Sequence, residues 1–354
     1  MTTILTTTGI SLYINASRNY NIKDPTDDQM RQYLRTKPEL ASAEANSLLQ
    51  IAQSDDHLVF LHTETPEAKK CAELLQEFFN NKGFKHIHLV KLQFQDDEKH
   101  IETHGLRNLV NTLIDEIEKA KRKKQDVVIN ATSGFKPEIG YSTMIGMLYQ
   151  IPVKYIHEKF RRMVTFNPIA LGWDTSLFLT YSWFFQWLDE EARPQRQVEE
   201  RLKALPDREK IQSMLTLPDE NGDIFLSAMG EALRRRFARE TEEAEETSWP
   251  LPTEIENVED KISSSLQDSK HHPIKNILFA CRKIAELPYV QGIIGGHFED
   301  TTLSRIKRID PDGTIRLLWA DNNKAENLSI QTTAQGLAQT RKVAEQIREI
   351  LEIE

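Results

Sequence analysis

Cysteine is scarce in this sequence. Only Cys71 and Cys281 occur among its 354 residues, and they lie far apart along the chain. Two cysteines cannot build a disulfide framework or a four-cysteine zinc site, so both are excluded. Because chains with so little cysteine are typical of reducing compartments, we expect a cytoplasmic protein.

Long apolar runs are also missing. The N-terminus has no basic leader followed by an apolar segment, so we expect no signal peptide. The most apolar stretch, residues 169–187, is interrupted by Asp174, Ser176, Thr180 and Ser182. This stretch is too polar to span a bilayer and is typical of a buried helix, so we expect no membrane partner.

Excess positive charge is absent from most of the chain. Hydrophobic residues make up 39% and charged residues 28%, as in a soluble globular protein, and the net charge is −9. Residues 1–260 carry 32 basic against 42 acidic side chains, whereas residues 261–354 carry 13 against 12. An acidic body disfavours nonspecific nucleic-acid binding, so residues 261–354 are the better place to handle RNA. The length indicates two or three domains.

Strands and helices alternate in the predicted structure of residues 1–173. The hydrophobic pattern predicts strands at residues 2–10, 58–62, 87–92, 127–130 and 153–157. It predicts helices near residues 68–79, 106–123 and 138–149. This alternation is typical of an α/β fold with a parallel, doubly wound, Rossmann-like sheet.

The middle of the chain is predicted to be a helical spacer. Residues 175–240 have a helical pattern, and residues 220–239 resemble the wing hairpin and helix of a winged-helix unit. The acidic run 240–246 and the proline-rich segment after Trp249 mark a linker, and serines 263–265 mark a second link.

A small α+β domain is predicted at the C-terminal end. A helix is expected at residues 274–287, strands at 303–309, 314–319 and 327–332, and a last helix at 337–353. The turn Asp310-Pro-Asp-Gly313 between two β-rich runs predicts a hairpin. The sequence therefore predicts a domain at 1–173, a spacer at 174–250, a linker at 251–264 and a domain at 265–354.

Two glycine loops follow predicted strands of the first domain. One is Thr6-Thr7-Thr8-Gly9-Ile10-Ser11, and the other is Asn130-Ala-Thr-Ser-Gly-Phe-Lys136. Ligands of open α/β sheets bind outside the carboxyl ends of the strands, near the switch point. Hydroxyls, free N–H groups and the Lys136 cation suit phosphate binding there. The alternative is that both loops are ordinary turns between a strand and a helix.

Together the two loops resemble those of the CRISPR-associated Rossmann fold (CARF) family. That family's first strand ends in a Thr/Ser-Gly loop, and a later one ends in Asn-Ala-Thr-Gly-Gly-Phe-Lys, where Ser133 departs from the pattern. Residues 155–159 and 163–171 also look like the strand pair that closes the family's domain. The resemblance covers residues 1–173. It implies a homodimer that binds one cyclic oligoadenylate, most commonly cyclic tetra-adenylate, as an allosteric activator, with no cofactor. The contact residues it implies are Thr8, Gly9, Ile10, Ser11, Thr63, Asn130, Thr132, Ser133, Gly134, Phe135 and Lys136.

Two common nuclease types are disfavoured by missing motifs. A HEPN ribonuclease needs an arginine four to six residues before a histidine, and after residue 172 only His271, His272 and His297 occur, none with such an arginine. A PD-(D/E)xK nuclease needs a carboxylate-rich strand ending in Glu-x-Lys, but the matches at 67–69 and 268–270 lie in a predicted helix and a link. We therefore expect no metal.

The last domain resembles RelE/ParE toxins, which pair a Lys-x-Lys strand with an Arg-Leu-x-Tyr-like strand. Here Arg305-Ile-Lys307-Arg308 precedes Arg316-Leu-Leu-Trp319. Strand alternation predicts Arg305 and Lys307 on one face, with Arg316 beside them. These cations would hold a scissile phosphate while a ribose 2′-OH attacks it. The alternative is that these long basic side chains only line a sheet face that is exposed to solvent.

Departures from the toxin pattern leave its catalytic set incomplete. Arg308 stands where an apolar residue is usual, and Trp319 replaces a tyrosine. His297 is a candidate acid or base. Arg341 and Gln331 are the nearest candidates for the family's late residues.

The two resemblances together imply an ancillary effector of type III CRISPR systems. Activated by the ring, it would be a metal-independent endoribonuclease that cuts mRNA on the ribosome and inhibits translation. One alternative is a CARF-linked winged-helix transcription regulator that uses Arg234, Arg235, Arg236 and Arg239, although we do not expect DNA binding. Another is a ring nuclease that degrades cyclic oligoadenylate with Thr8, Ser11 and Lys136.

Overall fold

The computed structural model divides into two units. It describes residues 1–93, 105–134, 136–156, 162–169, 175–267 and 273–353. One unit comprises Met1–Trp173 with Ser227–Ala232, and the other comprises Asp174–Leu226 with Leu233–Glu354. The first unit is called the sheet unit below, and the second is called the effector unit.

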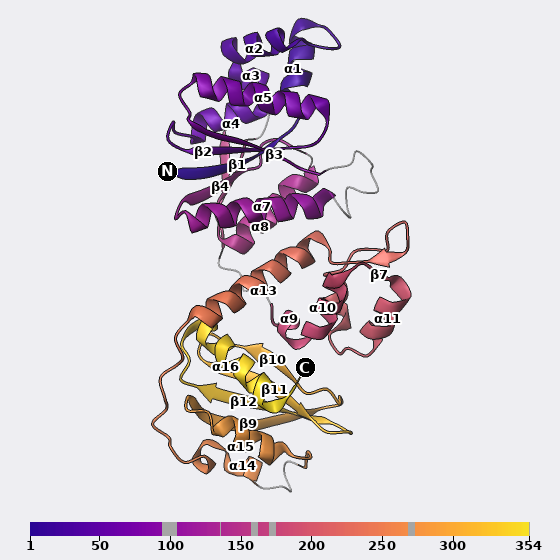
Figure 1. Ribbon diagram of the computed structural model, residues 1–354, viewed down its shortest axis with the longest axis vertical. Coiled ribbons are helices and arrows are strands. Elements are labelled where there is room, and N and C mark those ends of the chain that lie inside the picture. Colours follow the sequence, from indigo (N-terminus) through magenta and orange to yellow (C-terminus); the bar gives the residue numbers. More distant parts are fainter. Residues whose placement is uncertain (94–104, 135, 157–161, 170–174, 268–272, 354) are drawn as a thin grey trace. The chain divides into compact units, whose positions relative to one another are not determined.

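A six-stranded sheet forms the centre of the sheet unit, in the order β3-β2-β1-β4-β5-β6 (Figure 1). The first five strands in this order are parallel, and β6 pairs antiparallel with β5. The predicted parallel α/β sheet is therefore confirmed. The strands are β1 (Thr2–Thr8), β2 (His57–His62), β3 (His86–Lys91), β4 (Asp126–Asn130), β5 (Val153–Ile156) and β6 (Met163–Phe166).

Helices cover both faces of this sheet. The predicted helices appear as α5 (Pro66–Asn81), α7 (Leu106–Arg122) and α8 (Lys136–Tyr149), and α7 and α8 lie on the face opposite α5 (Figure 1). Thr65 caps α5 by accepting a hydrogen bond from the backbone N–H of Ala68. The sequence did not predict the four helices before β2, which are α1 (Ser11–Tyr20), α2 (Asp27–Thr36), α3 (Pro38–Ala41) and α4 (Ala43–Ile51).

An aromatic helical cluster begins the effector unit. Phe178, Tyr181, Phe184 and Phe185 are buried in its core. The residues expected to form a wing make a short hairpin closed by a bridge between Leu215 and Leu226. The elements are α9 (Ser176–Thr180), α10 (Ser182–Glu190), β7 (Arg193–Pro194), α11 (Gln195–Lys203), α12 (Arg208–Gln212), β8 (Asp223–Ile224) and, from Leu233 on, α13 (Ala228–Glu246), whose first residues belong to the sheet unit.

The acidic run 240–246, which by its composition marks the approach to a linker, is helical. It forms the last two turns of α13. Arg236 lies 2.8 Å from Glu240, and Arg239 lies 2.9 Å from Glu243. Pairs spaced four residues apart stabilise a helix, so the arginines and glutamates support one another along one helix.

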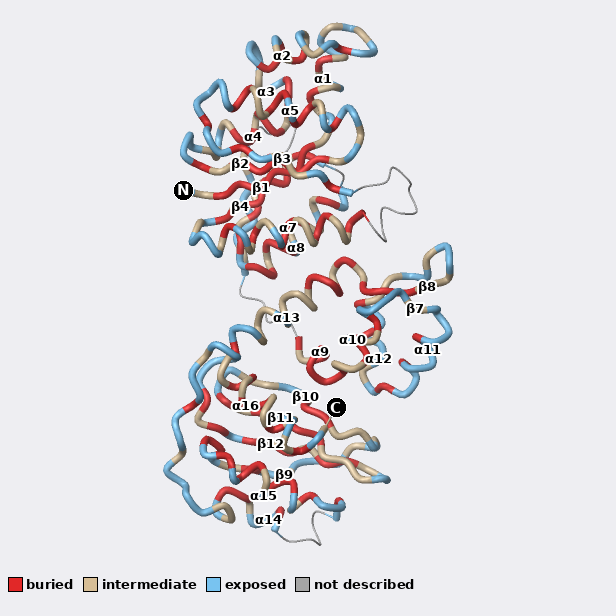
Figure 2. Tube along the Cα trace, in the orientation of Figure 1, coloured by how far each residue is buried: buried red, intermediate tan, exposed pale blue. Residues whose placement is uncertain are grey.

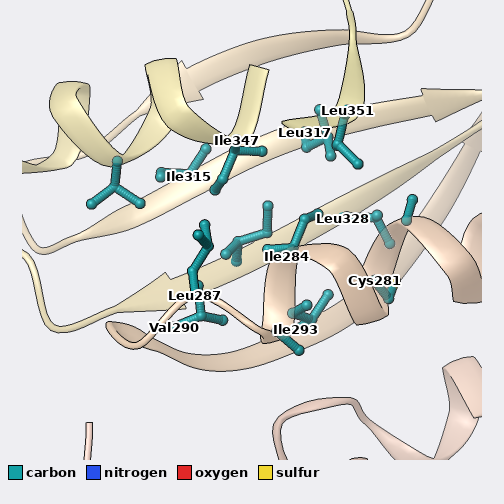
Figure 3. Packing of buried hydrophobic residues seen from close by; sticks show 14 of the residues in the cluster. Cys281, Ile284, Leu287, Val290, Ile293, Ile315, Leu317, Leu328, Ile347 and Leu351 are labelled. Atoms are coloured by element: carbon teal, nitrogen blue, oxygen red, sulfur yellow. The ribbon is translucent and has the colours of Figure 1, made fainter. Parts of the chain in front are cut away.

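An antiparallel sheet in the order β10-β11-β12-β9 completes the effector unit. Two helices, α15 (Ile277–Ala285) and α16 (Gly336–Leu351), contribute Cys281, Ile284, Ile347 and Leu351 to its core (Figure 3). The strands are β9 (Val290–Glu299), β10 (Arg305–Ile309), β11 (Thr314–Ala320) and β12 (Ala325–Thr332). The sequence had not predicted β9, which contains three glycines.

The predicted hairpin joins β10 to β11. Gly313 has φ +88°, and the Asp310 N–H donates to the Thr314 carbonyl at 2.8 Å. A left-handed residue at this position favours glycine, which explains the Asp-Pro-Asp-Gly turn.

The serine-rich link is part of the C-terminal core rather than a free connection. It follows η2 (Glu259–Lys261) and leads into α14 (Ser264–Gln267). Ile262 is buried and bridges to Ile293 of β9. Among the residues that the structure describes, no helix is both long and apolar enough to cross a membrane.

Candidate functional sites

The two glycine loops meet at the carboxyl edge of β1 and β4, which are neighbours with Thr6 opposite Asn130. Both strands end in buried residues, Thr8 in β1 and Asn130 in β4, and Figure 2 colours the chain around the labels of these strands by burial. The Thr7 hydroxyl donates to the Ser133 carbonyl, and the Gly9 N–H donates to the Ser133 Oγ at 3.1 Å. Because β2 and β4 lie on opposite sides of β1, this edge is the switch point of the sheet, where α/β proteins bind ligands.

Burial divides the predicted ligand residues into two groups. Thr8, Asn130 and Ser133 are buried, with exposed fractions of 4%, 0% and 7%. Asn130 Nδ2 donates to Ser47 Oγ at 2.8 Å, so this side chain holds the strand end rather than facing a ligand. Phe135 lies outside the described residues. The remaining predicted residues are partly or fully exposed, namely Gly9, Ile10, Ser11, Thr63, Thr132, Gly134 and Lys136.

Gly134 cannot be replaced without strain. It has φ +114°, and a Cβ there would lie 2.0 Å from Glu138 Oε2. The left-handed backbone and the carboxylate both require glycine at this turn. The carboxylate of Glu138 therefore lies against the second loop, beside the exposed Lys136 that begins α8.

Glu44 is a residue of this site that the sequence analysis missed. Its side chain is fully buried, and Oε1 accepts the Gly9 N–H at 2.9 Å. Oε2 accepts the Ser11 hydroxyl at 2.7 Å and the Ser42 hydroxyl at 2.6 Å. The sequence signal that could have revealed the helix of Glu44 is Ser42, a residue type that favours the N-cap position. Ser42 caps α4 by accepting the Ala45 N–H, which places Glu44 in the first turn of the helix.

Thr132 has its hydroxyl engaged inside the protein. Its Oγ1 donates to Asn130 Oδ1 at 2.7 Å and accepts the Ile156 N–H at 3.1 Å. The hydroxyl thus ties the second loop to β5.

On the C-terminal sheet, the predicted alternation of β10 fails because of a β-bulge. Arg308 lies opposite Arg316, but Arg305 lies opposite Leu318, and the register shifts between Ile306 and Arg308. An extra residue in one strand breaks the two-residue period, so Lys307 and Arg305 do not follow simple alternation.

Arg305 is buried, so the prediction of an open Arg305–Lys307 face was wrong. It is 4% exposed, and its Nη2 lies 3.8 Å from Asp207 Oδ2. The Tyr181 hydroxyl donates to the same Asp207 oxygen at 2.7 Å. Burial raises the pKa of Asp207, but Tyr181, Lys210 and Arg305 lower it more, so the net pKa lies below the usual value. Arg305 therefore joins the sheet to the helical cluster.

Lys307 belongs to a polar cluster with two residues that were not predicted, Glu299 and Asn327. Its Nζ donates to Glu299 and, at 3.0 Å, to Asn327 Oδ1. Asn327 Nδ2 donates to Glu299 Oε1 at 3.0 Å, and His297 Nε2 lies 3.6 Å from the same oxygen. Burial raises the pKa of Glu299, but the bonds from Lys307 and Asn327 lower it more, so the net pKa lies below the usual value.

Arg308 and Arg316 are exposed neighbours that share one carboxylate. Arg308 Nε lies 2.5 Å from Asp310 Oδ1, and Arg316 Nε lies 3.7 Å from Oδ2. Their side chains are 68% and 58% exposed. Together with Lys307 and its partner Glu299, these residues place three cations and two carboxylates on the C-terminal sheet. An excess of cations suits a phosphate better than a metal ion. In the described part of the chain, no cluster of three or more His, Cys, Asp or Glu residues could hold a metal.

The two residues proposed for the late positions of the toxin pattern do not join this cluster. Arg341 is 4% exposed on α16, and its guanidinium lies 2.6 Å from Glu240 of α13. Gln331 is exposed on β12, opposite Thr314.

The sheet unit has a relative among known families. Residues 39–169 match a CRISPR-associated family. Its description reads "CRISPR-associated protein (Cas_APE2256)". The matched CRISPR-associated segment includes Glu44 and the loop that ends at Lys136, and it begins after the Gly9 loop.

Two solved structures are similar over much of the chain. One is protein VC1899 from Vibrio cholerae, at 7% identity and a TM-score of 0.26, covering 94% of this chain and 77% of that chain. The other is Can2 from Sulfobacillus thermosulfidooxidans in complex with cyclic tetra-adenylate, at 10% identity, the same coverage and a TM-score of 0.26. At such scores neither likeness carries an argument about this chain.

Proposed function

We propose that this chain is a ribonuclease gated by cyclic oligoadenylate, acting as an ancillary effector of type III CRISPR systems. The observation that carries the proposal is the meeting of the Gly9 and Gly134 loops at the switch point of a parallel sheet. The second of these loops lies in the segment that matches the CRISPR-associated family.

The sheet unit is the proposed sensor. The exposed Lys136 begins α8, where backbone N–H groups and the helix dipole favour a phosphate. One cyclic tetra-adenylate would bind per homodimer, because a two-fold symmetric ring matches a two-fold axis. Calorimetry of the full chain with rings of each size tests this. We expect one tetra-adenylate per two chains, and no binding of any ring size would contradict the sensor assignment.

The C-terminal sheet is the proposed site of RNA cleavage. Lys307, Arg308 and Arg316 would hold the scissile phosphate while the ribose 2′-oxygen bonds to phosphorus and the bond to the 5′-oxygen breaks. The 2′-OH loses its proton, the 5′-oxygen gains one, and the products are a 2′,3′-cyclic phosphate and a 5′-hydroxyl. Arg305 anchors this strand to the helical cluster, and His297 beside Glu299 is the candidate acid or base.

The resemblance to RelE-like domains supports ribosome dependence. Those domains rely on the ribosome to place the 2′-OH in line. We therefore expect mRNA on translating ribosomes to be cut and the same RNA free in solution to be cut poorly. Equal cutting of both, or chemistry that strictly requires an added metal, would contradict this assignment.

The alternative of a DNA-binding regulator has less support. Arg234 lies 3.3 Å from Asp189, and Arg236 and Arg239 pair with carboxylates of their own helix. These arginines also lie on a helix whose last two turns are acidic, and residues 1–260 carry 32 basic against 42 acidic side chains, which disfavours DNA binding. Salt-dependent, sequence-selective binding of a duplex by the full chain would restore this alternative.

Ring cleavage is a further alternative for the sensor. It was based on Thr8, Ser11 and Lys136, but Thr8 is buried and the Ser11 hydroxyl donates to Glu44. Incubating the ring with the protein and separating linear products measures it directly.

A further inference from the structure

Glu44 places a negative charge at the point where the first loop would hold a phosphate. The Gly9 N–H and the Ser11 hydroxyl both donate to this carboxylate. These are donors that the loop would otherwise offer to an anion. Ser11 also begins α1, so the carboxylate sits at the positive end of that helix.

The carboxylate substitutes for a cap that α1 lacks. The N-cap residue Ile10 makes no side-chain capping bond, and the first turn of α1 has no acidic residue. Glu44, from the start of α4, supplies both the acceptor and the charge. The N-terminus of α1 is therefore a place that favours an anion, and the carboxylate of Glu44 occupies it.

Nothing in the described residues neutralises this charge. Glu44 is fully buried and accepts three hydrogen bonds from neutral donors, but no cation of the described chain lies within ion-pair distance of it. A buried charge is screened weakly, so it repels a second anion in the same loop even at physiological salt.

We propose that Glu44 is a specificity-determining residue that excludes polyphosphates from the sensor site. A glycine loop beside a helix N-terminus would otherwise suit inorganic phosphate or the adjacent charges of a nucleoside triphosphate. With Glu44 in place, the first loop admits only ligand parts of low charge density, and phosphodiester recognition falls to the exposed Lys136 at the start of α8. The identity of the ring as the ligand rests on the proposed function. The exclusion of polyphosphates by Glu44 does not.

The substitution Glu44→Gln tests the role of the charge with little change of shape. The amide oxygen still accepts the Gly9 N–H, and the Ser11 and Ser42 hydroxyls can turn to accept from the amide nitrogen. We expect E44Q to bind ATP and inorganic phosphate about tenfold tighter, or more, than the wild type in calorimetry. Affinity for cyclic tetra-adenylate should change less. Glu39→Gln, an exposed carboxylate of the same unit, is the matched control and should change neither.

Wild-type protein supplies a second, independent measurement. Millimolar ATP or phosphate should leave its thermal unfolding midpoint unchanged. A rise that is lost in Lys136→Ala would overturn the proposal, as would unchanged ATP affinity in folded E44Q. If the wild type binds no ring but E44Q still gains ATP binding, the proposed function fails and the role of Glu44 stands. If the wild type binds the ring and E44Q gains nothing, the role of Glu44 fails alone.

Discussion

Single side chains decide which groups of the proposed sensor site would be open to a ligand. Lys136 is exposed at the start of α8, whereas Thr8, Asn130 and Ser133 are buried in the strand ends. The sequence predicted all of them as contacts because it located the loops. It could not separate them, because burial depends on tertiary packing; Asn130, for example, donates to Ser47 of a helix that was not predicted.

Lys136→Ala should weaken binding of cyclic tetra-adenylate. A charge-assisted hydrogen bond contributes about 1.5–3 kcal/mol, which corresponds to a loss of roughly 10- to 100-fold in affinity. Calorimetry measures this, with the exposed Lys85→Ala as the matched control. Equal affinities of the two variants would remove Lys136 from the site.

Arg316 and Arg305 should behave differently although both are arginines of one sheet. Arg316→Ala removes an exposed cation, so we expect folding and ring binding to persist while cleavage slows by about 100-fold or more.

Arg305→Ala removes the buried guanidinium that pairs with Asp207. We therefore expect the free energy of unfolding to fall by about 3 kcal/mol. Urea unfolding and single-turnover cleavage separate the two effects. An Arg305→Ala protein of normal stability that has lost cleavage would instead make Arg305 a phosphate contact.

Acid should weaken the cluster around Lys307. The pKa of Glu299 is lowered in the folded protein, so its contribution to stability is present above the unfolded value, about 4.3, and is lost as pH falls through the folded value. The thermal midpoint of Glu299→Gln should therefore fall less steeply than that of the wild type between neutral pH and pH about 3. Parallel pH profiles would show that Glu299 is not coupled to Lys307.

At the scale of elements, the sequence predicted those whose pattern is continuous and missed those that tertiary contacts define. The strands β2 and β4 are short apolar runs in a parallel sheet, and β1 is rich in β-branched threonine, so all three have a strong strand pattern. By contrast, β9 contains Gly292, Gly295 and Gly296 and is held by pairing with β12. The bulge in β10 could not be predicted either, because a shift of register leaves no mark in the local sequence.

The contact between α13 and α16 is the element-scale feature most open to test. Arg341 is buried against Glu240, and the Thr175 hydroxyl also donates to Glu240 at 2.8 Å. Burial lowers the pKa of Arg341, so the guanidinium depends on this carboxylate.

Glu240→Ala should therefore destabilise the effector unit by about 3 kcal/mol, because it leaves a buried charge unpaired. Urea unfolding measures this loss, and the exposed Glu242→Ala on the same helix is the control. A Glu240→Ala protein as stable as the control would show that Arg341 finds another partner or water.

At the scale of the whole molecule, the proposed function couples ring binding in one unit to RNA cleavage in the other. The ring should act through its site, so Lys136→Ala should need more ring for the same cleavage. Arg316→Ala should bind the ring and fail to cut. Arg196→Ala removes an exposed cation of α11, whose side chain is 90% exposed. This control should change neither ring binding nor cleavage.

The most direct test is cleavage of mRNA on translating ribosomes by the full chain, with and without cyclic tetra-adenylate. The account predicts cuts that appear only with the ring, are unaffected by EDTA at the chemical step once ribosome integrity is controlled, and are lost in Arg316→Ala. Cleavage that is independent of the ring would contradict the proposed function, as would full activity in the Lys307/Arg308/Arg316 triple-alanine protein.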